Sequence, residues 1–238
     1  MAGVIYERQE TGLVDAINHH YSLVQQPFTL RAGSTSLTSV ISARKVEGRL
    51  PNGNEPYPDV EITTSTRKLY KLSMKGLSAP SMAGGGLDGL ERTVPGFSGR
   101  FLNAALQEYI RRGYQNGDQI PDIFGRVSDN LKRTIVLGTP DIGGPISHMY
   151  IGPMDVVGTR SGNSLVVNGG LYNATSYANS HNLFLRLRKR RGDQPFDSTT
   201  RDNRGYPLIL GRSPTAGDTG RRIVIVDRPP ANAIVVEF

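Results

Sequence analysis

The sequence predicts a mixed α/β fold, with helices and strands alternating over residues 1–132 and a β-rich region over residues 133–238. Apolar residues recur with helical spacing over residues 6–24 and again over residues 98–112. Between these helices, two β-like segments flank a short polar connection. The β-rich region contains short apolar segments separated by turn residues, and it forms either a second domain or part of the same one.

The first helix has an apolar face and a defined end. From Leu13 onward, apolar residues recur at i, i+4, i+8 and i+11, which places them on one side of the helix. Pro27 disfavours helical backbone at the preceding residue, so we expect the helix to end by residue 26. Gly12 weakens a helix, and this cost predicts a closely packed neighbour at that position.

The remaining elements are short. A strand is predicted at 36–46, a hairpin at 59–64 and 68–74, and a short helix at 122–132. The long polar segment 191–221 is expected to be a loop or an arm. The strands predicted after residue 132 are 134–137, 149–151, 155–157, 164–167, 183–187, 208–210, 222–226 and 233–238.

The composition excludes several classes of function. The 238 residues include no cysteine, which excludes disulfide scaffolds, zinc fingers, iron–sulfur clusters and thiol catalysis. Lys and Arg number 28 against 21 Asp and Glu, and this net charge of +7 favours a polyanionic partner such as DNA. No apolar run reaches the ~18 residues of a membrane helix, and the N-terminus lacks a signal-peptide core. We therefore expect a cytoplasmic or intracellular protein that does not contact membranes.

The predicted hairpin carries polar residues suited to catalysis. Asp59 and Glu61 share one face of the first strand, and Ser73 and Lys75 share one face of the second. Paired strands lie ~4.8 Å apart, so the four side chains are expected to converge at one end of the sheet. Carboxylate and carbonyl oxygens are the ligands that Mg²⁺ prefers, and a lysine beside the ion acts on bound water. This set of residues is sufficient for metal-assisted hydrolysis of a phosphodiester.

The segment that runs from Tyr57-Pro58-Asp59 to Ser73-Met74-Lys75 resembles the signature of the PD-(D/E)xK nuclease superfamily, which includes many restriction endonucleases. In that superfamily a Pro-Asp pair begins one strand, an acid-x-Lys lies on the next, and a preceding helix usually adds an acidic residue. The resemblance covers roughly residues 6–115 and implies a restriction-endonuclease-like core. It implies that Asp59 and the carbonyl of Met74 bind Mg²⁺ and that Lys75 acts on the attacking water.

The chain departs from this signature at Ser73, where the superfamily usually has an acid. Some restriction endonucleases with Ser-x-Lys use a replacement glutamate from further along the chain. On this resemblance Glu91 is the nearest downstream candidate, and Glu61 is a second. The acid of the preceding helix is either Glu10 or Asp15. Without the resemblance, the Pro-Asp pair is an ordinary turn pair and Ser-x-Lys an ordinary edge-strand pattern.

A basic segment in the second half is the candidate contact for DNA. On a strand, two of its arginines share a face, opposite two leucines that are expected to be buried. Such a row suits contacts to phosphates, and the alternative is a solvated edge strand. The glycine-rich segment 83–87 lacks the Gly-Lys-Ser/Thr of a P-loop. The predicted DNA-binding residues are Arg186, Arg188, Lys189, Arg190 and Arg191.

These observations favour a Mg²⁺-dependent DNA endonuclease, or a nuclease-like DNA-processing protein, that hydrolyses phosphodiester bonds. The alternative is a non-catalytic structural or assembly protein of a virus particle, built on the same fold. The polar segment 191–221 would then be an arm between subunits. In both cases we expect a homo-oligomer, and in the alternative it would belong to a larger assembly in the virion.

Overall fold

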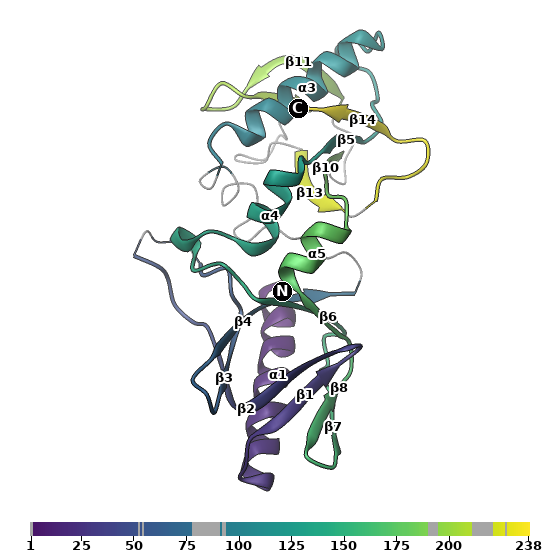
Figure 1. Cartoon of the computed structure of the whole chain (residues 1–238). Helices are drawn as coiled ribbons and strands as arrows, with labels where there is room; N and C mark the ends of the chain where they lie inside the picture. Colours follow the sequence, from purple (N-terminus) through teal and green to yellow (C-terminus); the bar gives the residue numbers. More distant parts are fainter. Residues whose placement is uncertain are drawn as a thin grey trace. The chain divides into compact units, whose positions relative to one another are not determined.

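The computed structural model describes residues 2–51, 53, 55–77, 91, 94–189, 195–210, 221–226 and 228–238; for residues 2–7, 188, 189, 210 and 221–226 it describes the backbone (Figure 1). Helices and mixed sheets confirm the mixed α/β fold. The chain forms two compact units, Met1–Gly84 with Arg133–Ser180, and Gly85–Lys132 with His181–Phe238. The chain passes from one unit to the other three times, and the boundary expected after Lys132 is one of these crossings. Each unit therefore contains residues from both halves of the chain.

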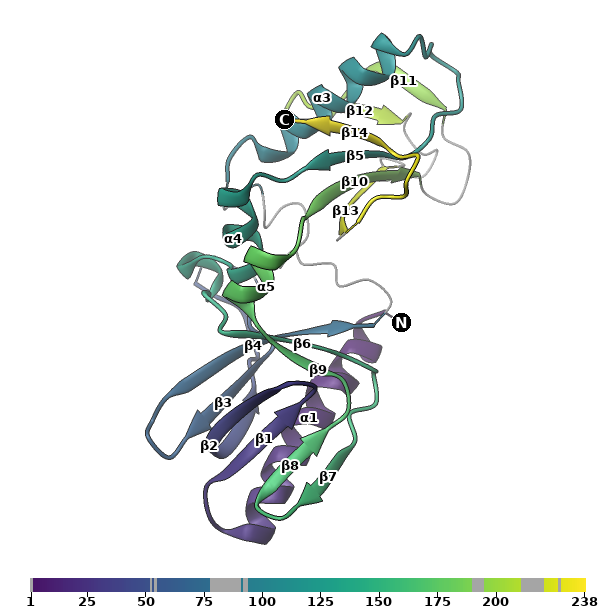
Figure 2. The same ribbon diagram turned by 45° about the vertical axis from the view of Figure 1, so that its right-hand side comes forward.

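The first unit contains one eight-stranded mixed sheet (Figure 2). Strands β2, β3 and β4 form an antiparallel meander, and β6 lies parallel to β4 beside it. The predicted hairpin is confirmed as β3 and β4, whereas β1, β7 and β9 were not predicted. In sheet order the strands are β7 (Gly158–Ser161), β8 (Ser164–Val167), β1 (Phe28–Ala32), β2 (Thr35–Lys45), β3 (Val60–Thr64), β4 (Leu69–Gly76), β6 (His148–Gly152) and β9 (Gly170–Asn173).

Helix α1 (Ala2–Val24) packs against this sheet and ends at Val24, as Pro27 predicts (Figure 2). Leu13 and Ile17 on its apolar face are buried in the core. A Cβ at Gly12 would lie 3.3 Å from the Cβ of Val156, so the expected close neighbour is present. Asn18 receives a hydrogen bond from the Ala43 amide and donates one to the Ala43 carbonyl, both 2.9 Å, which fixes α1 along β2.

The segment around residues 122–137 differs from the prediction. Residues 123–126 form strand β5 (Ile123–Arg126), and the helix α4 (Asp129–Leu137) begins later and includes the predicted strand 134–137. Ile135 and Val136 are buried on α4, so tertiary packing outweighs their β-branched preference. Residues 155–157 are also not a strand, because the Asn168 side chain bonds the backbone there at Val157 N and Asp155 O.

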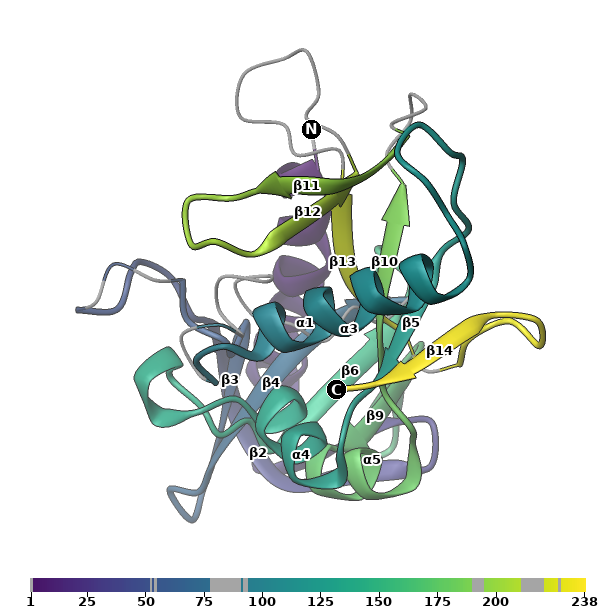
Figure 3. The same ribbon diagram turned by 90° about the horizontal axis from the view of Figure 1, so that it is seen from above.

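The second unit places helix α3 (Phe97–Arg111) between a sheet and a hairpin (Figure 3). On one side Phe101 packs over Gly125 of β5, and on the other Gly99 faces Tyr206. Within the segment expected to be a loop or an arm, residues 196–210 form a hairpin that includes the predicted strand 208–210, while 191–194 and 211–220 lie outside the described residues. The sheet consists of β13 (Arg221–Val226), β10 (Phe184–Lys189), β5 and β14 (Ile234–Glu237), and the hairpin of β11 (Phe196–Arg201) and β12 (Pro207–Leu210).

Buried histidines make the stability of the first unit sensitive to acid. His20 is 3% exposed and stacks edge-on against Phe28, and its Nε2 has no hydrogen-bond partner. Burial lowers the pKa of His20, and the charges of Arg160 and His19 lower it further. Because the pKa of His20 is lower in the folded protein than in the unfolded chain, folding favours its neutral form. The contribution of His20 to the free energy of unfolding is therefore complete above about pH 6.5 and is lost as the pH falls below that value.

We therefore expect His20→Leu to reduce the loss of unfolding free energy between about pH 7.5 and pH 5, measured by urea unfolding at each pH. The exposed neighbour gives a matched control, because His19→Leu should leave the pH dependence largely as in the unmodified chain. His148 retains part of the dependence, since burial lowers its pKa as well. Equal pH dependence in the His20 variant and the unmodified chain would contradict this assignment.

Candidate functional site

Asp59 lies immediately before β3 and is bonded to the next strand through its backbone and its side chain. Its N–H donates to the Leu72 carbonyl at 2.8 Å, which sets the register of the two strands. Its Oδ2 accepts hydrogen bonds from Ser73 Oγ at 3.0 Å and from the Met74 N–H at 2.6 Å. The structure thus brings Asp59, Ser73 and Met74 together, as the hairpin predicts, and both side-chain bonds use the same carboxylate oxygen.

Lys75 lies two residues beyond Ser73 on β4, and its charge acts on Asp59. Burial raises the pKa of Asp59, and the Lys75 charge and the bonds from Met74 and Ser73 partly oppose that rise. Burial lowers the pKa of Lys75, and the charges of Asp59 and Glu10 partly oppose this change. The two pKa values therefore move toward each other, as is typical of acid–base pairs at catalytic sites.

The aromatic ring of Tyr57 lies near the side-chain amine of Lys75. The Lys75 Nζ lies 5.6 Å from the centroid of the Tyr57 ring, a cation–π distance. The Tyr57 hydroxyl donates to the carbonyls of Ile135 and Val136 in α4, at 3.1 and 2.9 Å. At Gly138, where φ is +72°, a Cβ would approach the same ring to 2.3 Å. In the sequence Tyr57 stands out only as the first residue of a motif, so its contact with Lys75 was not predicted.

Of the two candidate acids on the first helix, Glu10 has a charge that acts on Lys75. Glu10 acts on the pKa of Lys75, and its Oε2 lies 3.6 Å from the Nζ of Lys45. Asp15 is exposed, and it is not among the charges that shift the pKa of Lys75 or Asp59. The rotation of α1, fixed by its buried apolar face, separates these two residues.

The two candidates for the replacement acid have other partners. Glu61 is buried and paired with Arg44 across β2 and β3. Glu91 belongs to the second unit, where its carboxylate accepts bonds from the N–H groups of Gly96 and Ser98, at 2.7 and 2.9 Å, at the start of α3. Neither set of contacts supports a role as a metal ligand beside Asp59.

Gln9 is a site residue that the sequence analysis missed. It is fully buried, and its Nε2 donates to the carbonyls of Lys75, Gly152 and Pro153 at 3.2, 2.9 and 3.1 Å. Because three carbonyls surround this atom, only the amide nitrogen fits there. Gln9 therefore fixes the adjoining ends of β4 and β6. A signal was present in the sequence, since position 9 continues the i, i+4 series of Leu13 and Ile17.

The predicted basic strand forms, with Leu185 and Leu187 buried as expected. Arg186, however, donates from Nε to Asp122 Oδ2 at 2.8 Å and lies over the Phe124 ring, so its guanidinium has protein partners. For Arg188 and Lys189 the structure describes the backbone. The predicted residues Arg190 and Arg191, and the glycine-rich segment 83–87, lie outside the described residues.

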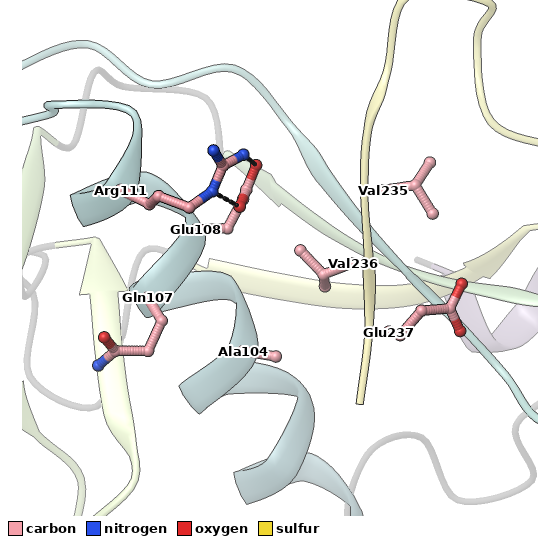
Figure 4. Close-up of a pocket in the computed structure, with 7 residues that line it drawn as sticks. All are labelled: Ala104, Gln107, Glu108, Arg111, Val235, Val236 and Glu237. Atoms are coloured by element: carbon pink, nitrogen blue, oxygen red, sulfur yellow. Dashed lines mark hydrogen bonds and ion pairs between the residues drawn. The ribbon is translucent and has the colours of Figure 1, made fainter.

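A cavity of about 400 Å³ lies in the second unit between α3 and β14 (Figure 4). Glu108 on its wall is held by Arg111 and Arg112, and hydrogen bonds from these two arginines lower its pKa to about 2. No residue predicted for catalysis or DNA binding lines it. The lining residues are Ala104, Gln107, Glu108, Arg111, Val235, Val236 and Glu237.

The metal-ligating capacity of the site is limited to two carboxylates. Over the part of the chain that the structure describes, no group of three or more His, Cys, Asp or Glu side chains is placed to hold a metal. Asp59 and Glu10 both act on Lys75, and Mg²⁺ is commonly held by one or two carboxylates with waters and substrate phosphate. Carboxylate and carbonyl oxygens are the donor types that Mg²⁺ prefers.

No family model, curated protein or solved structure matches the chain. Among the described residues, no helix is both long and apolar enough to cross a membrane.

Proposed function

We propose that the protein is a Mg²⁺-dependent DNA endonuclease, or a nuclease-like DNA-processing protein, that hydrolyses phosphodiester bonds at a site formed by Asp59, Lys75 and Glu10. The observation that carries the proposal is that Asp59, immediately before β3, is bonded to Ser73 and Met74 of β4, and that its charge and that of Lys75 on β4 act on each other while burial shifts their pKa values in opposite directions. The order of elements supports it, since α1 precedes the β2–β3–β4 meander and β6 lies parallel to β4.

Each residue has a chemical role in this proposal. Asp59, Glu10 and the Met74 carbonyl would hold Mg²⁺, which would supply positive charge beside the phosphate. Burial increases the neutral fraction of Lys75, so its amine can accept a proton from water as the water oxygen attacks phosphorus. The bond from phosphorus to the leaving oxygen then breaks. Ser73 contributes orientation, because its hydroxyl holds the Asp59 carboxylate.

The structural alternative has lost part of its support. Its support was the Gly/Pro-rich, many-stranded second half together with the polar segment 191–221, and residues 196–201 and 207–210 of that segment form a hairpin within the second unit. An assembly role remains the outcome expected if the purified chain does not cleave DNA and light scattering shows a ring or larger particle.

The two acids of α1 provide a matched test of the proposed site. Glu10→Gln is expected to lower Mg²⁺-dependent plasmid cleavage by about 10-fold or more, because it removes a negative charge that acts on Lys75. Asp15→Asn removes the same charge from an exposed position on the same helix and should leave the rate unchanged. Equal rates in the two variants, measured in single turnover over a range of Mg²⁺ concentrations, would contradict the role of Glu10.

A further inference from the structure

Strand β14 is an edge strand of the four-stranded sheet in the second unit, and its sequence is apolar for an edge. Among the described residues it pairs with β5 alone, so the backbone N–H and C=O groups on its other side have no strand beside them. Its sequence is Ile-Val-Val-Glu, and Val235 is 39% exposed. The strand thus lacks the lysine or proline that commonly prevents an exposed edge from pairing with another chain.

The cavity between α3 and β14 reaches this free edge. Val235, Val236 and Glu237 all line it, although consecutive side chains of a strand point to opposite faces. The Val236 side chain points toward α3, whereas those of Val235 and Glu237 point away from it (Figure 4). All of β5 is described, and none of its residues lines the cavity. The space therefore lies along the unpaired side of β14, where an added strand would fill it.

A second copy of the chain offers a strand that fits this edge. When β14 pairs antiparallel with β14 of a second copy, the two-fold axis is perpendicular to the sheet, so α3 of each copy lies on the same face. Directly opposed residues share a face, so in the two registers with the most residue pairs Val236 lies beside Ile234 or Val236 of the second copy. In neither register are the two Glu237 side chains opposed, and each is paired with Arg126 at 2.9 Å. The edge is therefore complementary to itself in apolar pattern and in charge.

We propose that β14 pairs with β14 of a second copy and joins the two four-stranded sheets into one sheet of eight strands. The free edge supplies main-chain hydrogen bonds, and Val235 and Val236 supply the apolar contact. The strand has four residues, so the shared surface is small and we expect a dissociation constant of about 1–100 μM. None of the residues proposed for cleavage belongs to this surface, so the inference goes beyond the proposed hydrolysis.

The test is the molar mass of the full chain, measured by sedimentation velocity between about 1 and 200 μM. The unmodified chain is expected to change from monomer to dimer over this range. Val235→Lys should weaken the association by about 10-fold or more, because it brings like charges onto the two paired strands. Val166→Lys on β8 of the first unit is the matched control, since Val166 is 38% exposed and the added charge is the same. A monomer at every concentration, or equal weakening by both variants, would overturn the proposal.

A second measurement uses the absence of cysteine from the chain. In both registers the two copies of residue 235 lie within about 10 Å of each other, so a short bismaleimide should link two Val235→Cys chains in high yield. Val166→Cys carries its only thiol on the first unit and should give little linked product. Equal yields from the two variants would overturn the proposal. Because neither measurement involves DNA or Mg²⁺, both succeed or fail independently of plasmid cleavage.

Discussion

Replacement of Lys75 by methionine is expected to lower the rate of plasmid cleavage by about 10²- to 10⁴-fold, the usual contribution of a general base. Methionine retains the length of the side chain and its packing near Tyr57, but it has no group that accepts a proton. The same change removes the positive charge that opposes the rise in the pKa of Asp59. Less of the Asp59 carboxylate would then be ionised at neutral pH.

The pH dependence separates this role from a merely structural one. Lys75 must be neutral to accept a proton, so the rate should rise with pH and level off above its pKa, which burial lowers from the ordinary lysine value. This rise should disappear in Lys75→Met. Lys68→Met, an exposed lysine just before β4, should retain both the rate and its pH profile. A Lys75→Met enzyme with an unmodified profile would exclude Lys75 as the base.

Replacement of Gln9 by leucine should lower the free energy of unfolding by about 2–4 kcal/mol, because buried carbonyls lose their donor. The Nε2 of Gln9 bonds the carbonyls of Lys75 and Gly152, residues at the ends of β4 and β6, and leucine of similar size supplies no hydrogen bond. Gln9→Glu should be at least as destabilising at neutral pH, since a carboxylate would face the same carbonyls.

Urea unfolding gives the magnitude, and Gln26→Leu is the matched control. Gln26 is exposed and bonds Asn163 at 3.2 Å, so its loss should change the free energy of unfolding by less than about 0.5 kcal/mol. We also expect slower cleavage in Gln9→Leu, because the backbone of Lys75 loses a support. Stability within 0.5 kcal/mol of the unmodified chain would show that Gln9 does not hold the two strand ends.

The sequence was sufficient to predict the centre of the site because its determinants are local. A short connection joins β3 to β4, so the alternation of side chains is enough to predict that Asp59 and Ser73 meet. The helix α1 was predictable for the same reason, from its apolar spacing and Pro27. Its rotation against the sheet was not, because core packing decides it, and this rotation leaves Glu10 half-buried and Asp15 exposed.

The long-range features were beyond sequence reasoning. The glutamate nearest to Lys75 downstream, Glu91, follows the first crossing between units, which falls in the glycine-rich segment 83–87, but that segment alone did not indicate a change of unit. Its carboxylate also accepts a hydrogen bond from the hydroxyl of Tyr206 at 2.8 Å, and Tyr206 lies more than 100 residues away in the sequence. Likewise, the sequence alone predicted that Arg186 would be available to bind DNA. The pairing of β10 with β5 brings Arg186 to Asp122, which accepts its hydrogen bond.

The most direct test of the proposed function is cleavage of supercoiled plasmid by the purified chain and by Asp59→Asn, each with Mg²⁺ and with EDTA. Asparagine keeps an acceptor for Ser73 and Met74 but removes the charge that would hold the metal. We expect nicked or linear DNA with the unmodified chain and Mg²⁺, and intact plasmid in the other three reactions. Intact plasmid in all four reactions, or equal cleavage by Asp59→Asn, would contradict the assignment of this site as a nuclease.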